Sequence, residues 1–504
     1  MKVTILGATG NMGRATIKAL LPLPFVETLS VLIRSRRKEE AFRKTFARDI
    51  DRFDIVLGDT TDEEALSRLV DGSDVVIDLA ASIPPHSDHD PKGAVAANEE
   101  GPKRVVRILK RENPTAFFIH VSTVALYGDR TLAHPIGKVG DPVLPSPLDM
   151  YSTTKARGEL AVLESGLPRW IVLRQTAMFS DDLLKNNMND GLMFHTRLDS
   201  PLEWVSDKDS ATLLSRIVTA KEEGRLPEDF YRRVYDVAGG KRSRVYGYQV
   251  FSLGLSLAGL SFRKVFRPKD FVTRNFHGVW YEDVNPLQEM FSYQNDSIYD
   301  YFELQRKKHP LWKMARCLPQ SFIRHILCDV LLGKNDNTPS LWYKRKDEAR
   351  ITAFFGGFQA YESLPSTWKD FPLPEKIPDD LKGLDPLYDR DKPEEEIDFE
   401  DLKNLARLHG GEFLESSFQK GDVHTPLAFK DQDGNDFRMS AYSVYKAGHW
   451  NNPSLSRLVW DFDRISKRDR IYAQVWLESH SIGEDVLYGM DENFLPYVRK
   501  GGKA

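Results

Sequence analysis

Three glycines near the amino terminus constrain the fold of this chain more than any other feature. An apolar run at residues 3–6 leads directly into Gly7, Gly10 and Gly13, and a helical pattern follows. In a strand–turn–helix unit, the first glycine permits a tight turn and the second lets backbone N–H groups approach a pyrophosphate. The third lets the helix pack closely against the strand. Because the positive end of the helix would then face the phosphates, this segment predicts a dinucleotide site.

A second motif, from Tyr151 to Lys155, places a phenol and an ammonium group four residues apart. On a helix, residues at this spacing lie on the same face. A neighbouring cation favours the phenolate, so Lys155 is expected to lower the pKa of Tyr151 from its ordinary value of about 10 and to ease proton transfer. Upstream, Ser122 and Thr123 follow a predicted strand at 117–120, where a hydroxyl can hydrogen-bond a substrate oxygen.

In order and spacing, the glycine turn, the strand-end hydroxyl and the Tyr-x-x-x-Lys helix resemble those of the extended short-chain dehydrogenase/reductase family. This family is also called the NAD-dependent epimerase/dehydratase family. The resemblance covers roughly the first half of the chain and implies an α/β fold, a doubly wound parallel Rossmann sheet with a helix-rich substrate lobe. It also implies that Tyr151 is the general acid/base and that Lys155 holds the hydroxyls of the nicotinamide ribose.

Length and composition exclude several classes of protein. With 504 residues, of which 41% are hydrophobic and 29% charged, the chain is expected to form two or three globular domains. A net charge of -4 gives no general attraction for nucleic acid, so no nucleic-acid partner is expected. The two cysteines, Cys317 and Cys328, fit a reducing compartment. A strand beginning at residue 2 or 3 leaves no room for a signal peptide, and we expect a cytoplasmic protein.

Strand and helix patterns alternate through the first half of the chain. The run 75–81 has almost no polar alternation, which is typical of a parallel strand buried on both faces. Together with the predicted strands at 3–6, 29–34, 54–58, 116–122 and 170–174 and the helices between them, it predicts a doubly wound sheet.

We divide the chain into four regions. Residues 1–175 are predicted to form the NAD(P)-binding Rossmann domain, completed by 205–240, and residues 176–204 and 241–345 the substrate lobe. Residues 346–401 are predicted to be an acidic, proline-rich linker, since Pro, Asp and Glu dominate the segment 378–401. Residues 402–504 are predicted to form a C-terminal α+β extension, with strands at 426–430 and 437–446 around a tight turn at Asp433 and Gly434. The sequence assigns no role to this extension.

The end of the second predicted strand bears on the choice of cofactor. An Asp or Glu there would bind the ribose 2'-hydroxyl of NAD, but this strand ends in Arg34, Ser35, Arg36 and Arg37. Guanidinium groups suit a 2'-phosphate, so NADP is the expected cofactor, with NAD kept open. A solvated helix start is the alternative role for these arginines. Asp59 is expected either to contact the adenine amino group or to cap the next helix, a role for which Asp62 competes.

The remaining site residues follow from the order of these motifs and from the resemblance. Successive strand residues alternate faces, so only one of Ser122 and Thr123 can point at the substrate, and comparison with similar sequences favours Thr123. Asn98 lies where the family often has an asparagine, although an ordinary polar helix residue is the alternative. The catalytic candidates are therefore Tyr151, Lys155, Thr123 and Ser122. The cofactor-binding candidates are Gly7, Thr9, Gly10, Asn11, Met12, Gly13, Arg34, Arg37, Asp59, Ala80, Ala81, Asn98 and Lys155.

The residues after Thr123 bear on the reaction. Dehydratases of the family carry an acidic pair there, whereas this chain has Val124 and Ala125, which disfavours dehydration. The segment 173–179 lacks the asparagine-containing pattern of the sugar-nucleotide enzymes. Because the substrate lobe is rich in Phe, Trp, Leu and Met, we expect a partly apolar small molecule as substrate. The predicted reaction is hydride transfer to or from a carbonyl or hydroxyl carbon of this molecule. A nucleotide-sugar epimerase and a non-catalytic NADP-sensing regulator stay open as alternatives.

Two further features concern partners and metals. Residues 311–334 mix apolar side chains with four cations, which predicts either a helical hairpin packed on the substrate lobe or a peripheral membrane contact. The cations are Lys313, Arg316, Arg324 and Lys334. A homodimer also stays open. No metal site is predicted, because the spacing of the C-terminal histidines matches no compact ligand motif; these are His409, His424, His449 and His480.

Overall fold

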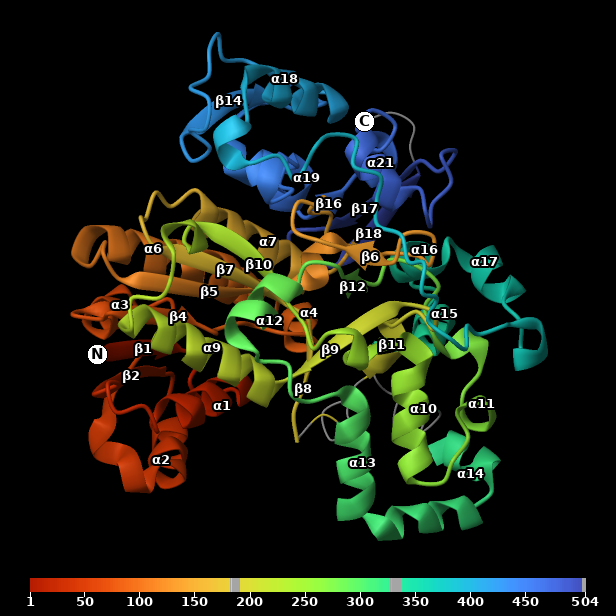
Figure 1. Ribbon diagram of the computed structural model, residues 1–504. Helices are drawn as coiled ribbons and strands as arrows, with labels where there is room; N and C mark the ends of the chain where they lie inside the picture. Colours follow the sequence, from red (N-terminus) through yellow and green to blue (C-terminus); the bar gives the residue numbers. More distant parts are fainter. Residues whose placement is uncertain (182, 184–190, 327, 329–336, 501–504) are drawn as a thin grey trace.

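A parallel sheet of seven strands forms the centre of the computed structural model, which describes residues 1–181, 183, 191–326, 328 and 337–500 (Figure 1). The strand order is β3-β2-β1-β4-β5-β7-β10. The order reverses between β1 and β4, and ligand sites of such sheets lie beyond the carboxyl ends of the strands at this point. The strands are β1 (Lys2–Leu6), β2 (Thr28–Ile33), β3 (Phe53–Leu57), β4 (Val75–Asp78), β5 (Phe117–Thr123), β7 (Trp170–Gln175) and β10 (Arg233–Val237).

Helices cover both faces of the sheet, which confirms the predicted doubly wound fold. Alternate residues of a strand enter different cores: Val75 and Ile77 pack with helices α1 (Asn11–Leu20) and α9 (Asp207–Glu222), and Val76 packs with those of the opposite face. The helices of that opposite face are α3 (Glu63–Val70), α6 (Glu100–Glu112) and α7 (Met150–Leu163). Strand β4 ends at Asp78, earlier than the predicted 81, because the Asp78 carboxylate accepts the backbone N–H of Ala80 at 3.1 Å and turns the chain.

The substrate lobe is rich in helices, as the sequence predicts. A small sheet ordered β11-β9-β8 joins it to the central domain, and β6 pairs with β12 beside it. These strands are β6 (Ile136–Gly137), β8 (Ala177–Phe179), β9 (Pro201–Ser206), β11 (Arg244–Tyr246) and β12 (Trp280–Tyr281). The helices are α10 (Gly247–Leu257), α11 (Phe262–Val265), α12 (Asn285–Phe291), α13 (Ile298–Lys308), α14 (Gln320–Arg324) and α15 (Pro339–Arg345).

The predicted linker at 346–401 is wrong in its first third. Helices α16 (Glu348–Phe355) and α17 (Phe358–Ser363) lie there, and Ile351 and Ala353 are fully buried. The acidic and proline-rich composition that suggested a linker belongs to the later part. That part contains only the short 3-10 turns η10 (Trp368–Asp370) and η11 (Glu394–Glu396).

The C-terminal region is α+β, as predicted, and contains two antiparallel sheets of three strands each. Their strands are β13 (Glu412–Phe413), β14 (Pro426–Lys430) and β15 (Asp436–Ser440), then β16 (Val459–Trp460), β17 (Val486–Met490) and β18 (Pro496–Lys500). The helices are α18 (Phe399–Leu408), α19 (Pro453–Ser456), α20 (Phe462–Ile465) and α21 (Arg470–Trp476). The predicted strand 437–446 stops at Ser440, because its N–H and hydroxyl both donate to the carboxylate of Glu164. A π-helical turn, η12 (Tyr442–Lys446), follows.

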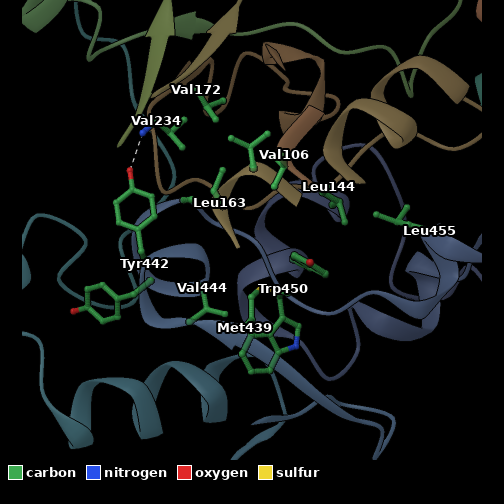
Figure 2. Packing of buried hydrophobic residues seen from close by; sticks show 14 of the residues in the cluster. Val106, Leu144, Leu163, Val172, Val234, Met439, Tyr442, Val444, Trp450 and Leu455 are labelled. Atoms are coloured by element: carbon green, nitrogen blue, oxygen red, sulfur yellow. Dashed lines mark hydrogen bonds between the residues drawn. The ribbon is translucent and has the colours of Figure 1, made fainter. Parts of the chain in front are cut away.

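The C-terminal region shares one core with the central domain (Figure 2). Tyr442 packs edge-on against Trp170 of β7, and its hydroxyl accepts the backbone N–H of Val234 on β10 at 2.7 Å. Met439, Val444 and Trp450 enter the same cluster. The extension is therefore built into the edge of the Rossmann domain.

Candidate functional site

A cavity of about 580 Å³ lies over the carboxyl ends of the central strands. The glycine turn after β1 forms one part of its wall, and Tyr151 and Lys155 of α7 form another. The substrate lobe contributes a third part, including Trp204, Phe251 and Phe276. The two motifs singled out in the sequence, which lie about 140 residues apart, thus face one space.

The glycine turn has the conformation that a phosphate-binding turn requires. Gly7 has φ +81°, and a Cβ atom on it would lie 2.7 Å from the backbone of Leu79. A Cβ on Gly13 would overlap the carbonyl oxygen of Gly7, which explains the close packing of α1 against β1. A Cβ on Gly10 would meet only that oxygen, at 3.4 Å. Packing within the protein therefore hardly requires a glycine at position 10. Close approach of a ligand to the backbone would require one.

The other residues of the turn differ in what they contact. Asn11 and Met12 line the cavity, and the Asn11 amide donates to the hydroxyl of Ser180 at 3.0 Å. The Arg14 guanidinium donates to the carbonyl of Thr9 and to the Asn11 side chain, both at 2.6 Å, and so fixes the turn. Thr9 itself lies outside the cavity wall.

The arginines after β2 lie on an exposed surface beyond the cavity wall. Arg34 Nε is 3.8 Å from Asp59 Oδ2, and both side chains are largely exposed. Burial lowers the pKa of Lys38, and the charges of Arg34 and Arg37 lower it further, so three cations are close together here. Asp62, not Asp59, caps α3 by accepting the N–H of Ala65 at 3.0 Å.

Asn98 braces the loop after β4 against α7. It is fully buried in a π-helical turn, η2 (Val95–Glu99), that precedes α6. Its side chain accepts the N–H of Ser82 at 2.7 Å, donates to the carbonyl of Ser82 at 2.9 Å and donates to Thr154 Oγ1 at 3.0 Å. Two residues of this loop are predicted to bind the cofactor. Ala81 lines the cavity, whereas Ala80 does not and donates its backbone N–H to the carboxylate of Asp78.

Tyr151, Lys155 and Thr123 come together at the cavity. The carboxylate of Asp149 caps α7 by accepting the N–H of Ser152 at 2.9 Å, which places Tyr151 in the first turn of the helix. Burial raises the pKa of Tyr151 to about 12, and hydrogen bonding with Thr123 opposes this rise. Lys155 is buried, and its Nζ donates to the carbonyl of Val121 at 2.7 Å. The pKa of Tyr151 thus moves in the opposite direction from the lowering expected on account of Lys155.

Ser122 and Thr123 point to opposite sides of β5, as strand geometry requires. The Ser122 hydroxyl donates at 2.5 Å to Glu159, which follows Lys155 by one helical turn on α7. Thr123 Oγ1 accepts the N–H of Ala125 at 3.1 Å. The hydroxyl directed at Tyr151 is therefore that of Thr123, while that of Ser122 is bound to a buried carboxylate.

Comparison with known sequences bears on the amino-terminal part of this protein. Residues 3–230 match the sequence profile of the NAD dependent epimerase/dehydratase family. This part of the chain is therefore similar to that family. The resemblance stated from the sequence is confirmed for these residues, and a long C-terminal region follows the matched part.

Two curated members are similar over part of their length. The chain is 30% identical to dTDP-glucose 4,6-dehydratase of Mycolicibacterium smegmatis over 165 residues, 32% of this chain and 48% of that protein. It is 32% identical to dTDP-4-dehydrorhamnose reductase of the same organism over 117 residues, 23% of this chain and 34% of that protein. The chain therefore spans about half or less of the length of these curated relatives.

Solved structures of family members also resemble this one. UDP-glucuronic acid 4-epimerase from Bacillus cereus, in complex with UDP-glucuronic acid and NAD, is 19% identical, with a TM-score of 0.48; the match covers 61% of this chain and 98% of that chain. dTDP-glucose 4,6-dehydratase from Bacillus anthracis, in complex with NAD, is 17% identical, with a TM-score of 0.47, and covers 62% of this chain and 99% of that one.

The C-terminal region adds residues around this cavity that sequence reasoning did not find. His449 Nε2 lies 3.0 Å from Glu159 Oε1, and Arg174 donates to the same oxygen at 2.6 Å and to the carbonyl of Ala447 at 2.7 Å. Burial alone would raise the pKa of Glu159, but Arg174 and His449 outweigh burial and hold it well below its ordinary value. Met490 and Pro496, at the facing ends of β17 and β18, line the cavity itself.

A histidine of the substrate lobe was also missed. His277 lines the cavity, and its Nδ1 lies 3.4 Å from Oδ2 of Asp149, which precedes Tyr151 by two residues. Burial raises the pKa of Asp149, but the interactions with His277 and Ser152 outweigh burial, so the pKa lies below its ordinary value. No spacing in the sequence relates residues 149 and 277. Only the fold brings them together.

Within residues 1–181, 183, 191–326, 328 and 337–500, no group of three or more His, Cys, Asp or Glu side chains could hold a metal ion. Of the C-terminal histidines, His409 pairs with Asp469 at 2.7 Å, His424 stacks on Tyr442 and His480 stacks on Trp476.

Proposed function

We propose that this protein is an NAD(P)(H)-dependent oxidoreductase. It would transfer a hydride to or from a carbonyl or hydroxyl carbon of a partly apolar small molecule, with Tyr151 as general acid/base. The observation that carries this proposal is that the glycine turn, Tyr151 and Lys155 line a single cavity. A bound nicotinamide dinucleotide would supply or accept the hydride.

The residues present fit this cofactor. Gly10 is the N-cap residue of α1 and has no side chain that would cover the N–H groups at the helix start. Lys155 can turn its ammonium from the Val121 carbonyl to the ribose hydroxyls within the same cavity. The cluster of Arg34, Arg37 and Lys38 supports NADP over NAD, because three cations suit a 2'-phosphate.

The protonation state of Tyr151 favours proton donation. With a pKa of about 12, its phenol is protonated at neutral pH and can donate to a developing alkoxide in the reductive direction. The Thr123 hydroxyl is placed to hold the phenol or the substrate oxygen. A cation brought beside the phenol stabilises the phenolate left behind, which is the role proposed for Lys155.

The wall of the cavity supports a substrate that is apolar with a few polar groups. Its lining includes the apolar side chains of Val250, Phe251 and Phe354. Within it, Gln175 Oε1 and Trp204 Nε1 are buried without a hydrogen-bond partner among the described residues. A substrate hydroxyl could satisfy both, since it donates and accepts.

A nucleotide-sugar epimerase is the second candidate, and the dTDP-sugar names of the two curated relatives favour it. An epimerase regenerates its cofactor in each turnover and would retain it during purification, whereas the proposed oxidoreductase would exchange it freely. A non-catalytic NADP sensor is disfavoured, because it would need neither Tyr151 nor Lys155 in the cavity.

The proposal is tested by Tyr151→Phe. We expect NADPH-dependent turnover of carbonyl compounds to fall about 10²- to 10⁴-fold, since this is the usual contribution of general acid–base catalysis. The dissociation constant of NADPH should change little. Tyr299→Phe, at an exposed tyrosine, is the matched control. Equal turnover by wild type and Tyr151→Phe would remove Tyr151 from the mechanism.

A further inference from the structure

An exposed apolar surface lies at the end of the substrate lobe. We call it the lobe-tip surface and define it by six side chains that are each at least 38% exposed: Leu311, Trp312, Met314, Leu318, Phe322 and Ile326. They belong to η8 (Pro310–Cys317), to α14 and to the residues beside them. In Figure 1 this part of the chain, between α13 and α14, forms the lower edge of the molecule. Large exposed apolar side chains rarely gather so closely on a protein surface without a binding role.

The charge of this segment is opposite to that of the chain as a whole. The protein has a net charge of -4, yet residues 304–328 contain six Lys and Arg and no Asp or Glu. Arg324 is bound to Asp270, and Arg306 to Glu303. Lys313 and Arg316, in contrast, are exposed and form no salt bridge with any carboxylate in the part of the chain that the structure describes. The exposed apolar residues are thus accompanied by exposed cations.

We propose that the lobe-tip surface docks on an anionic lipid bilayer. Apolar side chains such as Trp312 and Leu311 would enter the boundary between head groups and acyl chains, and Lys313 and Arg316 would lie at the phosphates. A second apolar protein surface would not call for the cations, whereas an anionic membrane matches both features. Such docking is peripheral: none of the described helices is long and apolar enough to cross a membrane.

Helix α10 connects the lobe-tip surface to the cavity. Its first turns contribute Gly247, Val250 and Phe251 to the cavity wall. Just beyond its other end, Gly259 has φ +68° and meets η8, since a Cβ there would lie 3.1 Å from Cβ of Arg316. Docking would therefore bring the apolar wall of the cavity near the lipid phase, from which a lipophilic substrate could enter. This last step rests on the proposed function, whereas the docking itself does not.

Vesicle flotation of the full-length protein tests the docking without substrate or cofactor. We expect the wild type to float with phosphatidylcholine vesicles that contain phosphatidylserine and to remain largely at the bottom with phosphatidylcholine alone. Rising ionic strength should weaken the binding, since salt screens the charges. Leu311→Ser combined with Met314→Ser should lower the partition coefficient at least about tenfold. Lys313→Gln combined with Arg316→Gln should lower it about thirtyfold.

Leu414→Ser combined with Ile482→Ser is the matched control, because it removes two exposed apolar side chains from the C-terminal region. The control should float like the wild type, and unchanged melting temperatures would exclude misfolding of the variants. Absence of flotation, or equal flotation of all these proteins, would overturn the proposal. A dimer abolished by Leu311→Ser/Met314→Ser, without vesicle binding, would instead assign the surface to a second copy of the chain. Because flotation needs no turnover, it separates this inference from the proposed reaction.

Discussion

Arg34 directly follows β2 and presents a guanidinium where an acidic residue would bind a ribose hydroxyl. Its neighbours Arg37 and Lys38 add positive charge, and Asp59 at 3.8 Å keeps the group oriented without burying it. Because the Arg34 side chain is largely exposed, it contributes little to the stability of the fold. We therefore propose that Arg34 binds the 2'-phosphate of NADP.

Replacing Arg34 by alanine tests this role. We expect the dissociation constant of NADPH to rise about 10- to 100-fold, since a hydrogen bond to a charged group contributes roughly 1.5–3 kcal/mol. The dissociation constant of NADH should change little, because NADH lacks the 2'-phosphate. Fluorescence titration with NADPH and with NADH measures the two dissociation constants and hence their ratio. Arg48→Ala, at an exposed arginine, is the control. An equal loss for both nucleotides would contradict the assignment of Arg34 to the 2'-phosphate.

His195 in the cavity wall gives the stability of the protein a pH dependence. Burial lowers its pKa to about 4, and its Nε2 lies 3.0 Å from the carbonyl of Asn337. In the unfolded chain the pKa returns to about 6.5, so between these values the unfolded state binds more protons and stability rises with pH. The contribution of His195 is thus complete at neutral pH and is lost as the pH falls from 6.5 towards 4.

We expect the wild type to lose about 2 kcal/mol more unfolding free energy than His195→Gln between neutral pH and about pH 5. Urea unfolding at a series of pH values measures the difference. His86→Gln, at an exposed histidine, should follow the wild-type curve. Parallel curves for wild type and His195→Gln would show that the histidine is not neutral in the folded protein.

At the scale of elements, sequence patterns predict local structure well where one pattern spans the whole element. Strand β4 is apolar up to its last residue, Asp78, the glycine turn has its own spacing, and α7 carries Tyr151 and Lys155 on one face. Helix α16 was missed because the composition of the later residues 378–401 was extended back over it. Its apolar residues, Ile351 and Ala353 among them, are a signal that a window confined to 348–355 would have found.

The polar contacts behind α7 could not be predicted in the same way. Glu159 is bound by Ser122 and Arg174 and by His449, which lies 290 residues further along the chain. Such a pairing leaves no period or spacing in the sequence, because only the docking of the C-terminal region creates it. The same holds for His277 and Asp149. The residues of the glycine turn and of the Tyr-x-x-x-Lys motif could be predicted because each group lies within one short sequence motif. The residues that surround them could not be predicted, because they come from distant parts of the chain.

At the scale of the whole molecule, the C-terminal region packs behind helix α7, which carries Tyr151 and Lys155. It contributes His449 behind α7, Met490 and Pro496 to the cavity wall, and a large share of the core beside β7 and β10. A region bound in this way is expected to fold together with the Rossmann domain, in one cooperative unit.

Removing residues 399–504 should therefore prevent folding of the remainder. The deletion would expose Trp170, Val172 and Val234, and burial of each large apolar side chain contributes about 1.5–3 kcal/mol. It would also leave Glu159 and Arg174 without His449 and the Ala447 carbonyl, and a buried charge without its partners is costly. Because the total stability of a domain is only about 5–15 kcal/mol, losses of this kind are comparable to the whole stability of the remainder. Circular dichroism and intrinsic fluorescence should show one coincident thermal transition for the full-length protein and none for the fragment 1–398. A fragment that melts cooperatively and binds NADPH with the affinity of the full-length protein would mean that the extension is a separate domain.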